Sequence, residues 1–162
     1  VTDSGSILYK LNEGVQKSLS QESSSNKDGM DMTLIVLDEE KKTIQFSGAK
    51  NPLIYVKNGE FNIIKGNNNP IGGISKNGNR DYDTHTIPYE KDMMIYMFSD
   101  GFQDQFGGPD DRKFMVKRFK QMLHDIAEKP TEKQLTILNQ ELDDWMKNTR
   151  QLDDILVAGI RL

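Results

Sequence analysis

Carboxylates beside predicted strands are the residues of this sequence with the clearest chemical potential. Asp100 follows the apolar run 93–98, and Asp153 precedes the run 155–162. If these runs form neighbouring antiparallel strands, the end of one and the start of the other lie at the same sheet edge, and the two carboxylates converge. Converging carboxylates repel each other and need a cation. Hard oxygen ligands, without cysteine and with little histidine, favour Mg²⁺ or Mn²⁺ over Zn²⁺.

Each acidic motif also has a purely structural explanation. Asp and Gly build turns, so an Asp at a strand end does not by itself indicate a metal site. Asp28 and Gly29, ahead of the apolar run 32–37, can be read as a turn. For Asp31, a supporting role near the site and a structural role both stay open. The carboxylates at 143–144 are best explained as a solvated helix face.

The elements that must position these residues follow from hydrophobic periodicity. Apolar residues at helical spacing predict a first helix over residues 7–19, with Ser4 or Ser6 as its N-cap. Runs rich in β-forming residues predict strands, and Asn58-Gly59 is a strong hairpin signal between two of them. The predicted strands cover residues 32–37, 43–47, 53–56, 61–64, 82–87, 93–98 and 155–162.

Two further helices and two loops complete the prediction. Apolar residues line one helix over residues 114–126 and another over residues 135–145. Polar composition predicts surface loops at residues 21–27 and 66–80. The order of a helix, a run of antiparallel strands, two helices and a last strand predicts an α+β fold with helices layered on sheet, in a single domain over residues 1–162.

Composition narrows the function classes. The chain has 162 residues, a formal net charge of −4 and no cysteine. The negative charge gives no indication of nucleic-acid or membrane-surface binding, and the lack of cysteine excludes disulfides, thiolate zinc sites and cysteine nucleophiles. The apolar run 155–160 is far too short to span a bilayer, and no signal peptide is recognisable. Because the chain begins at Val1 rather than Met, we expect it to be a fragment.

Four motifs in a fixed order carry a resemblance to a known family. They are DGMD at 28–31, GAKNPL at 48–53, FSDGFQDQFGG at 98–108 and QLDDILVAGI at 151–160. Together they resemble bacterial phosphatases of the stage II sporulation protein E type, a branch of the metal-dependent PPM (type 2C) serine/threonine phosphatases. The resemblance extends from the first helix to the last strand.

The resemblance implies both a fold and a chemistry. The fold would be an αββα sandwich of antiparallel sheets, and two Mn²⁺ or Mg²⁺ ions would activate a water that hydrolyses phosphoserine or phosphothreonine. Asp100 and Asp153 match the family's metal ligands in these motifs. Gly101, Asp154 and Asp31 would support the site, with Gly101 allowing close approach of the backbone to the metal site.

One departure from the family pattern qualifies this prediction. Two upstream family motifs, an Asp on an early strand and an Asp before a Gly-His-Gly turn, do not occur in this sequence. We therefore expect a domain that lacks its first strands, with half of its metal ligands, so that the fragment alone binds metal weakly or not at all. The alternative function is a non-catalytic pseudo-phosphatase, a regulatory or binding module on the same fold.

The family also implies partners and a location. The substrate would be a phosphorylated regulatory protein, such as an anti-anti-sigma-type regulator, and a sensor region would lie upstream in the full-length protein. We expect no nucleic acid partner and no membrane contact by this segment. The expected location is the cytoplasm, including the case of a cytoplasmic output domain of a membrane sensor.

Overall fold

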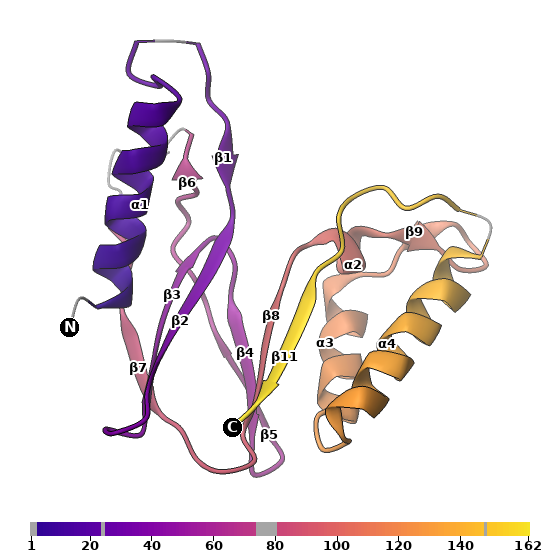
Figure 1. Ribbon diagram of the computed structural model, residues 1–162. Coiled ribbons are helices and arrows are strands. Elements are labelled where there is room, and N and C mark those ends of the chain that lie inside the picture. The colour runs from indigo at the N-terminus through magenta and orange to yellow at the C-terminus, as the bar shows by residue number, and fades with distance from the viewer. Residues whose placement is uncertain (1–2, 24, 74–80, 148) are drawn as a thin grey trace. The chain divides into compact units, whose positions relative to one another are not determined.

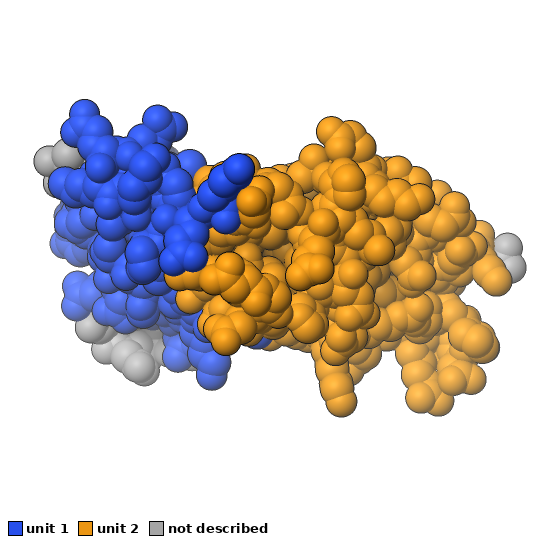
Figure 2. All heavy atoms as spheres, turned by 90° about the horizontal axis from the view of Figure 1, so that it is seen from below, with its two compact units in different colours: residues 1–53, 63–91 blue, residues 54–62, 92–162 orange. Residues whose placement is uncertain are grey.

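The amphipathic N-terminal segment folds as a helix beside antiparallel strands in the computed structural model of the chain (Figure 1). The structure describes residues 3–23, 25–73, 81–147 and 149–162. The chain divides into two compact units, residues 1–53 with 63–91 and residues 54–62 with 92–162, which are coloured separately in Figure 2.

The first unit combines one helix with two groups of antiparallel strands. Its three-stranded sheet has the order β2-β3-β7, and a separate short pair joins β1 to β6. Leu8 of the helix is fully buried in a cluster with Ala49, Ile71 and Tyr82. The elements are α1 (Ser4–Ser18), β1 (Gly29–Met30), β2 (Met32–Asp38), β3 (Thr43–Ala49), β6 (Ile71–Gly72) and β7 (His85–Pro88).

The start of α1 differs from the prediction. Asp3, not Ser4 or Ser6, is the N-cap, and its carboxylate accepts a hydrogen bond from the Ser6 backbone N–H at 3.0 Å. Ser4 is buried, and its hydroxyl is bonded to the Ser47 hydroxyl at 2.8 Å. A carboxylate is a strong N-cap acceptor, which leaves the Ser4 hydroxyl available to join helix and sheet.

The second unit is built on a four-stranded antiparallel sheet with the order β11-β8-β4-β5. Two long helices follow β8 in the chain, and the last strand, β11, returns to pair with β8 (Figure 1). The elements are β4 (Leu53–Lys57), β5 (Glu60–Ile64), β8 (Met94–Phe98), α2 (Gly101–Asp104), β9 (Phe106–Gly107), β10 (Arg112–Lys113), α3 (Val116–Ile126), α4 (Thr131–Met146) and β11 (Val157–Arg161).

The core of the second unit joins β4 and β8 to the helices α3 and α4. Tyr96 and Phe98 of β8 pack with Phe119 and Leu123 of α3 and with Leu138 of α4. The buried Tyr96 hydroxyl donates a hydrogen bond to Gln134 Oε1 at 2.7 Å. Apolar burial and a satisfied polar pair therefore fix both helices against the strand that leads to Asp100.

Most predicted elements are confirmed, with shifted ends. The Asn58-Gly59 hairpin joins β4 to β5, and both residues have positive φ (51° and 77°), as a type I′ turn requires. The strand predicted at 82–87 is β7, which begins only at His85, and the strand predicted at 155–162 begins at Val157. Strand ends are set by hydrogen-bond partners, which apolar composition does not reveal.

The predicted loops are confirmed only in part. Residues 21–23 and 25–27 contain neither helix nor strand. The predicted loop 66–80 contains β6, because the short strand β1 offers its backbone as a partner, and residues 74–80 lie outside the described residues. The assignment of residues 1–162 to a single domain stays a prediction. Within the described ranges, no helix has the length and apolar character needed to cross a membrane.

Candidate metal centre

The two strands that lead to Asp100 and from Asp153 are antiparallel neighbours, the arrangement under which the two carboxylates were expected to converge. Phe98, at the end of β8, pairs with Val157, at the start of β11, and the register continues to Met94 opposite Arg161. Asp100 comes shortly after β8, and Asp153 comes shortly before β11. Both residues therefore belong to loops at the same end of this strand pair (Figure 1).

Ser99 joins these two loops directly. Its hydroxyl donates to the backbone oxygen of Asp154 at 2.9 Å and accepts the backbone N–H of Leu156 at 3.0 Å. Its own N–H donates to the backbone oxygen of Leu156 at 3.0 Å. These three bonds extend the β8–β11 pairing past the end of both strands. The residue before Asp100 is thus bonded to the residue after Asp153.

Gly101 brings the backbones even closer. It is buried, and a Cβ atom at this position would lie 2.3 Å from the backbone oxygen of Asp154 and 3.1 Å from Ile155 Cγ1. Real Cβ atoms are not found so close to backbone oxygen, so the loop after Asp100 can approach Asp154 only because residue 101 is glycine. The close approach is to the backbone of Asp154, and the predicted approach of the Gly101 backbone to a metal site stays a prediction.

The carboxylates themselves face solvent. Asp100, Asp153 and Asp154 are all exposed. Asp153 Oδ1 accepts the N–H of Asp154 at 2.8 Å, whereas the carboxylate of Asp100 makes no hydrogen bond or ion pair to another described residue. The Gln151 side chain donates to the Asp153 backbone oxygen at 2.7 Å. The backbone of both loops is held, while carboxylate oxygen atoms stay accessible to a cation.

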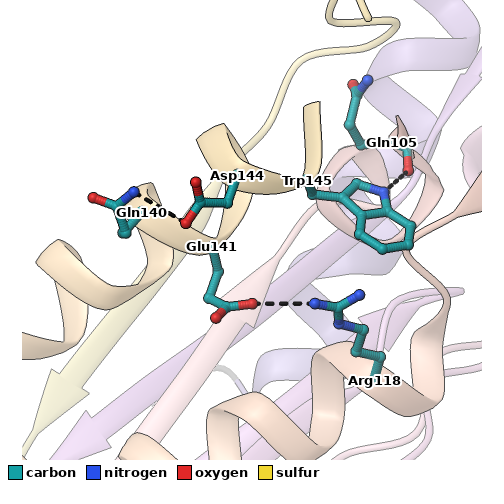
Figure 3. A network of polar contacts seen from close by, with 6 residues as sticks. All are labelled: Gln105, Arg118, Gln140, Glu141, Asp144 and Trp145. Atoms are coloured by element: carbon teal, nitrogen blue, oxygen red, sulfur yellow. Dashed lines mark hydrogen bonds and ion pairs between the residues drawn. The ribbon is translucent and has the colours of Figure 1, made fainter. Parts of the chain in front are cut away.

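Gln105 is a buried contributor that the sequence did not identify. It is 1% exposed, its Nε2 donates to the backbone oxygen of Arg150 at 3.0 Å, and its Oε1 accepts the N–H of Leu152 at 3.2 Å. Its backbone oxygen accepts the indole N–H of Trp145 at 3.0 Å (Figure 3). Gln103, Asp104 and Gln105 are three polar residues in a row, and nothing in the sequence indicates which of them is buried.

An aromatic cluster surrounds this Trp145 contact. The Arg118 guanidinium carbon lies 4.4 Å from the ring centroids of both Phe114 and Trp145. Arg118 also forms an ion pair with Glu141 at 3.3 Å (Figure 3). These contacts join α3 to α4 beside Gln105. They hold the Trp145 ring where its indole N–H donates to the backbone oxygen of Gln105.

Comparison with known proteins decides the family. The sequence profile described as "Stage II sporulation protein E (SpoIIE)" matches residues 2–162. The chain belongs to the stage II sporulation protein E family. No curated protein sequence matches it.

Solved structures of this family and its relatives share the fold. The SiaA-PP2C domain of Pseudomonas aeruginosa is 29% identical with a TM-score of 0.86, over 99% of this chain and 61% of that domain. The phosphatase domain of SpoIIE from Bacillus subtilis (Mn presoaked) is 17% identical with a TM-score of 0.62, over 100% of this chain and 73% of that one.

A third structure, the RsbU and RsbW domains of a Mycobacterium tuberculosis protein, is 17% identical with a TM-score of 0.65, over 92% of this chain and 40% of that one. The predicted fold class, an α+β fold of the PPM (type 2C) phosphatases with antiparallel sheets, is confirmed. The chain spans 61% of the length of the Pseudomonas domain.

Asp31 lies in the other compact unit. It follows β1, and its carboxylate forms an ion pair with Lys50 Nζ at 3.5 Å, with both side chains partly exposed. Within its own unit, the ion pair with Lys50 is the contact that its side chain makes among the described residues. Its predicted supporting role stays a prediction.

The possible metal ligands of this SpoIIE-family chain are of the type that binds a hard divalent cation, but they are too few to hold one alone. Asp100 and Asp153 offer carboxylate oxygens, the ligands that Mg²⁺ and Mn²⁺ prefer. Among the residues that the structure describes, no group of three or more His, Asp or Glu side chains gathers to hold a metal. A two-ion centre would need more ligands than these two carboxylates.

Proposed function

We propose that this chain is part of a metal-dependent protein serine/threonine phosphatase of bacterial signalling. The observation that carries the proposal is the bonding between the loops of Asp100 and Asp153, at the same end of the β8–β11 pair. Exposed carboxylates on two mutually fixed loops are suited to share a cation. Membership of the SpoIIE family supports phosphatase chemistry for such a site.

The roles of the residues follow from their surroundings. Asp100 and Asp153 would hold Mn²⁺ or Mg²⁺, and Gly101 would let their loops approach. Asp154 would support the site through its backbone oxygen, which Ser99 already binds. Bound Mn²⁺ or Mg²⁺ supplies a water of lowered pKa and neutralises negative charge on a phosphoryl group. The remaining ligands of a two-ion centre would come from outside the described residues.

The kind of substrate rests on the relatives. One matched structure contains an RsbU and an RsbW domain, and another is RsbX in complex with magnesium, 17% identical with a TM-score of 0.55 over 95% of this chain and 70% of that one. We propose a phosphorylated regulatory protein, of the anti-anti-sigma type, as substrate. We further propose a cytoplasmic location and an upstream sensor region in the full-length protein.

A second candidate is a non-catalytic regulatory module on the same fold. It is favoured by the lack of a group of three metal-ligating side chains among the described residues. Both candidates predict the same fold and the same Ser99 bonds, so only metal-dependent turnover distinguishes them.

Hydrolysis by the complete protein tests the proposal. We expect the protein that contains this chain to hydrolyse p-nitrophenyl phosphate and a phosphoserine peptide when Mn²⁺ is added, and to stop when the metal is removed by a chelator. Asp100→Asn should abolish most of this activity, whereas Asp143→Asn, on the exposed face of α4, should not. Turnover at the background rate, or an unchanged rate for Asp100→Asn, contradicts the enzyme proposal and supports the regulatory module.

A further inference from the structure

Gln105 has a buried side chain whose polar atoms serve the segment that carries Asp153. The stretch between the end of α4 and the start of β11 contains no helix or strand among its described residues. Within it, Arg150 and Leu152 are bonded to the two ends of the Gln105 amide, at 3.0 Å and 3.2 Å. An irregular segment has few backbone bonds of its own, so such side-chain bonds determine where it lies.

Gln105 and Ser99 hold this segment on both sides of Asp153. Gln105 binds positions 150 and 152, before Asp153, and Ser99 binds positions 154 and 156, after it. Both residues belong to the loop of Asp100, since Ser99 precedes it and Gln105 follows α2, which starts at Gly101. The bonds from Gln105 and Ser99 to these four positions therefore fix the backbone of Asp153 relative to that of Asp100.

Gln105 is itself fixed by its backbone. Its carbonyl oxygen accepts the indole N–H of Trp145 at 3.0 Å and the N–H of Phe114 at 2.9 Å. Trp145 is in turn packed edge-on against Phe114 and lies beside Arg118 (Figure 3). Because the backbone of Gln105 is held in place by these contacts, its side chain is already oriented toward the segment that carries Asp153.

We propose that Gln105 is a positioning residue for the metal site, which sets the loop of Asp153 against the loop of Asp100. The inference rests on the proposed function. Gln105 acts through the backbone at Arg150 and Leu152, and none of its hydrogen bonds goes to a carboxylate. The side chain must be an amide because it donates to the backbone oxygens of Phe106 and Arg150 and accepts the N–H of Leu152. Metal affinity responds strongly to such orienting contacts.

The same unit contains a matched control, Gln134. It is 3% exposed, its Oε1 accepts from the Tyr96 hydroxyl, and its Nε2 donates to the backbone oxygen of Lys129 at 2.8 Å. Its contact with Met94 places it at the start of β8, the end away from Asp100. Gln105→Met and Gln134→Met each replace a buried, bonded amide by an apolar side chain of similar size.

The test compares both variants in the complete protein by three measurements. They are thermal unfolding, the Mn²⁺ concentration that half-activates hydrolysis, and hydrogen exchange of the Leu152 amide in the metal-free protein. We expect both variants to lower the unfolding temperature. Gln105→Met alone should raise the half-activating Mn²⁺ concentration about tenfold or more and speed the exchange of Leu152. Trp145→Phe, which removes the indole bond to Gln105 together with part of the ring packing on Phe114 and Arg118, should raise the Mn²⁺ requirement by less.

Different failures have different meanings. If the wild-type protein hydrolyses phosphate esters with Mn²⁺ and Gln105→Met changes the Mn²⁺ requirement no more than Gln134→Met does, the positioning role is overturned and the proposed function stands. If the wild type shows no Mn²⁺-dependent hydrolysis, the proposed function is overturned together with the inference. Should Gln105→Met not fold, Trp145→Phe decides, and an Mn²⁺ requirement equal to wild type overturns the inference.

Discussion

The hydroxyl oxygen of Ser99 lies 2.9 Å from the backbone oxygen of Asp154 and joins two loops that are far apart in sequence. One loop follows β8 and contains Asp100, and the other precedes β11 and contains Asp153. The same hydroxyl also accepts the N–H of Leu156. A single side chain therefore makes two bonds between the loops beyond the last paired residues of β8 and β11. The position of the Asp100 loop relative to the Asp153 loop depends on these bonds.

Removal of the Ser99 hydroxyl should weaken both the fold and the site. We expect Ser99→Ala to lower the free energy of unfolding by about 1 to 3 kcal/mol, because the N–H of Leu156 and the oxygen of Asp154 lose a partner. Ser99→Thr keeps the hydroxyl and is the matched control. Urea unfolding of both variants measures the difference. Equal stability of Ser99→Ala and wild type would show that water replaces the hydroxyl at no cost.

A methyl group at Gly101 should separate the two loops. We expect Gly101→Ala to destabilise the protein by about 1 to 3 kcal/mol, since its Cβ would meet the backbone oxygen of Asp154 at 2.3 Å and the backbone must shift. Gly14→Ala is the control, because nothing lies within 4 Å of a Cβ there and Gly14 is inside α1. This change should stabilise by about 0.5 to 1 kcal/mol. Thermal unfolding that shows the same sign for both variants would contradict the close approach.

The N-cap of α1 predicts a dependence of stability on pH. Hydrogen bonds from the Thr84 hydroxyl, the Ser6 hydroxyl and the Ser6 N–H hold the pKa of the Asp3 carboxyl far below its usual value. Because this pKa is depressed on folding, the charged carboxylate stabilises the fold above its unfolded pKa of about 4, and this contribution is lost as the pH falls below that value.

Asp3→Asn isolates this charge. The variant should unfold at a lower temperature than wild type at pH 7, and the difference should shrink below about pH 4, because the Asp3 carboxyl of the unfolded wild type then binds a proton while that of the folded protein stays ionised. Thermal unfolding from pH 7 to pH 2 measures this convergence, with Asp143→Asn on the exposed face of α4 as control. A difference for Asp3→Asn that stays constant over the whole range would contradict the role of the charged N-cap.

The sequence predicted those features that depend on local chemistry. Asn58-Gly59 identified its hairpin because few residues accept positive φ at both turn positions. The pairing of the strands that adjoin Asp100 and Asp153 was only a condition of the sequence argument, and the register of Phe98 with Val157 meets that condition. Gly101 was expected to let the backbone approach a metal site, which stays a prediction, and the structure shows its close approach to the backbone of Asp154.

Features that depend on tertiary partners could not be predicted. Ser4 and Ser6 are as suitable as Asp3 for a helix N-cap, until Ser47 in the sheet binds the Ser4 hydroxyl. Gln105 looks like any polar loop residue, because its burial depends on Arg150 and a segment distant in sequence. Pairings across such sequence distances leave no local periodic signal, so they are visible only in the fold.

The most direct test of the central claim, that Asp100 and Asp153 share one metal site, is a double-mutant cycle on Mn²⁺-dependent hydrolysis by the complete protein. Asp100→Asn, Asp153→Asn and the double variant are compared with wild type, and Asp143→Asn serves as control. We predict that each single change removes most of the Mn²⁺-dependent rate and that the double change removes little more, because ligands of one site act as a unit. Effects that multiply independently, or an Asp153→Asn rate equal to the control, would contradict a shared site.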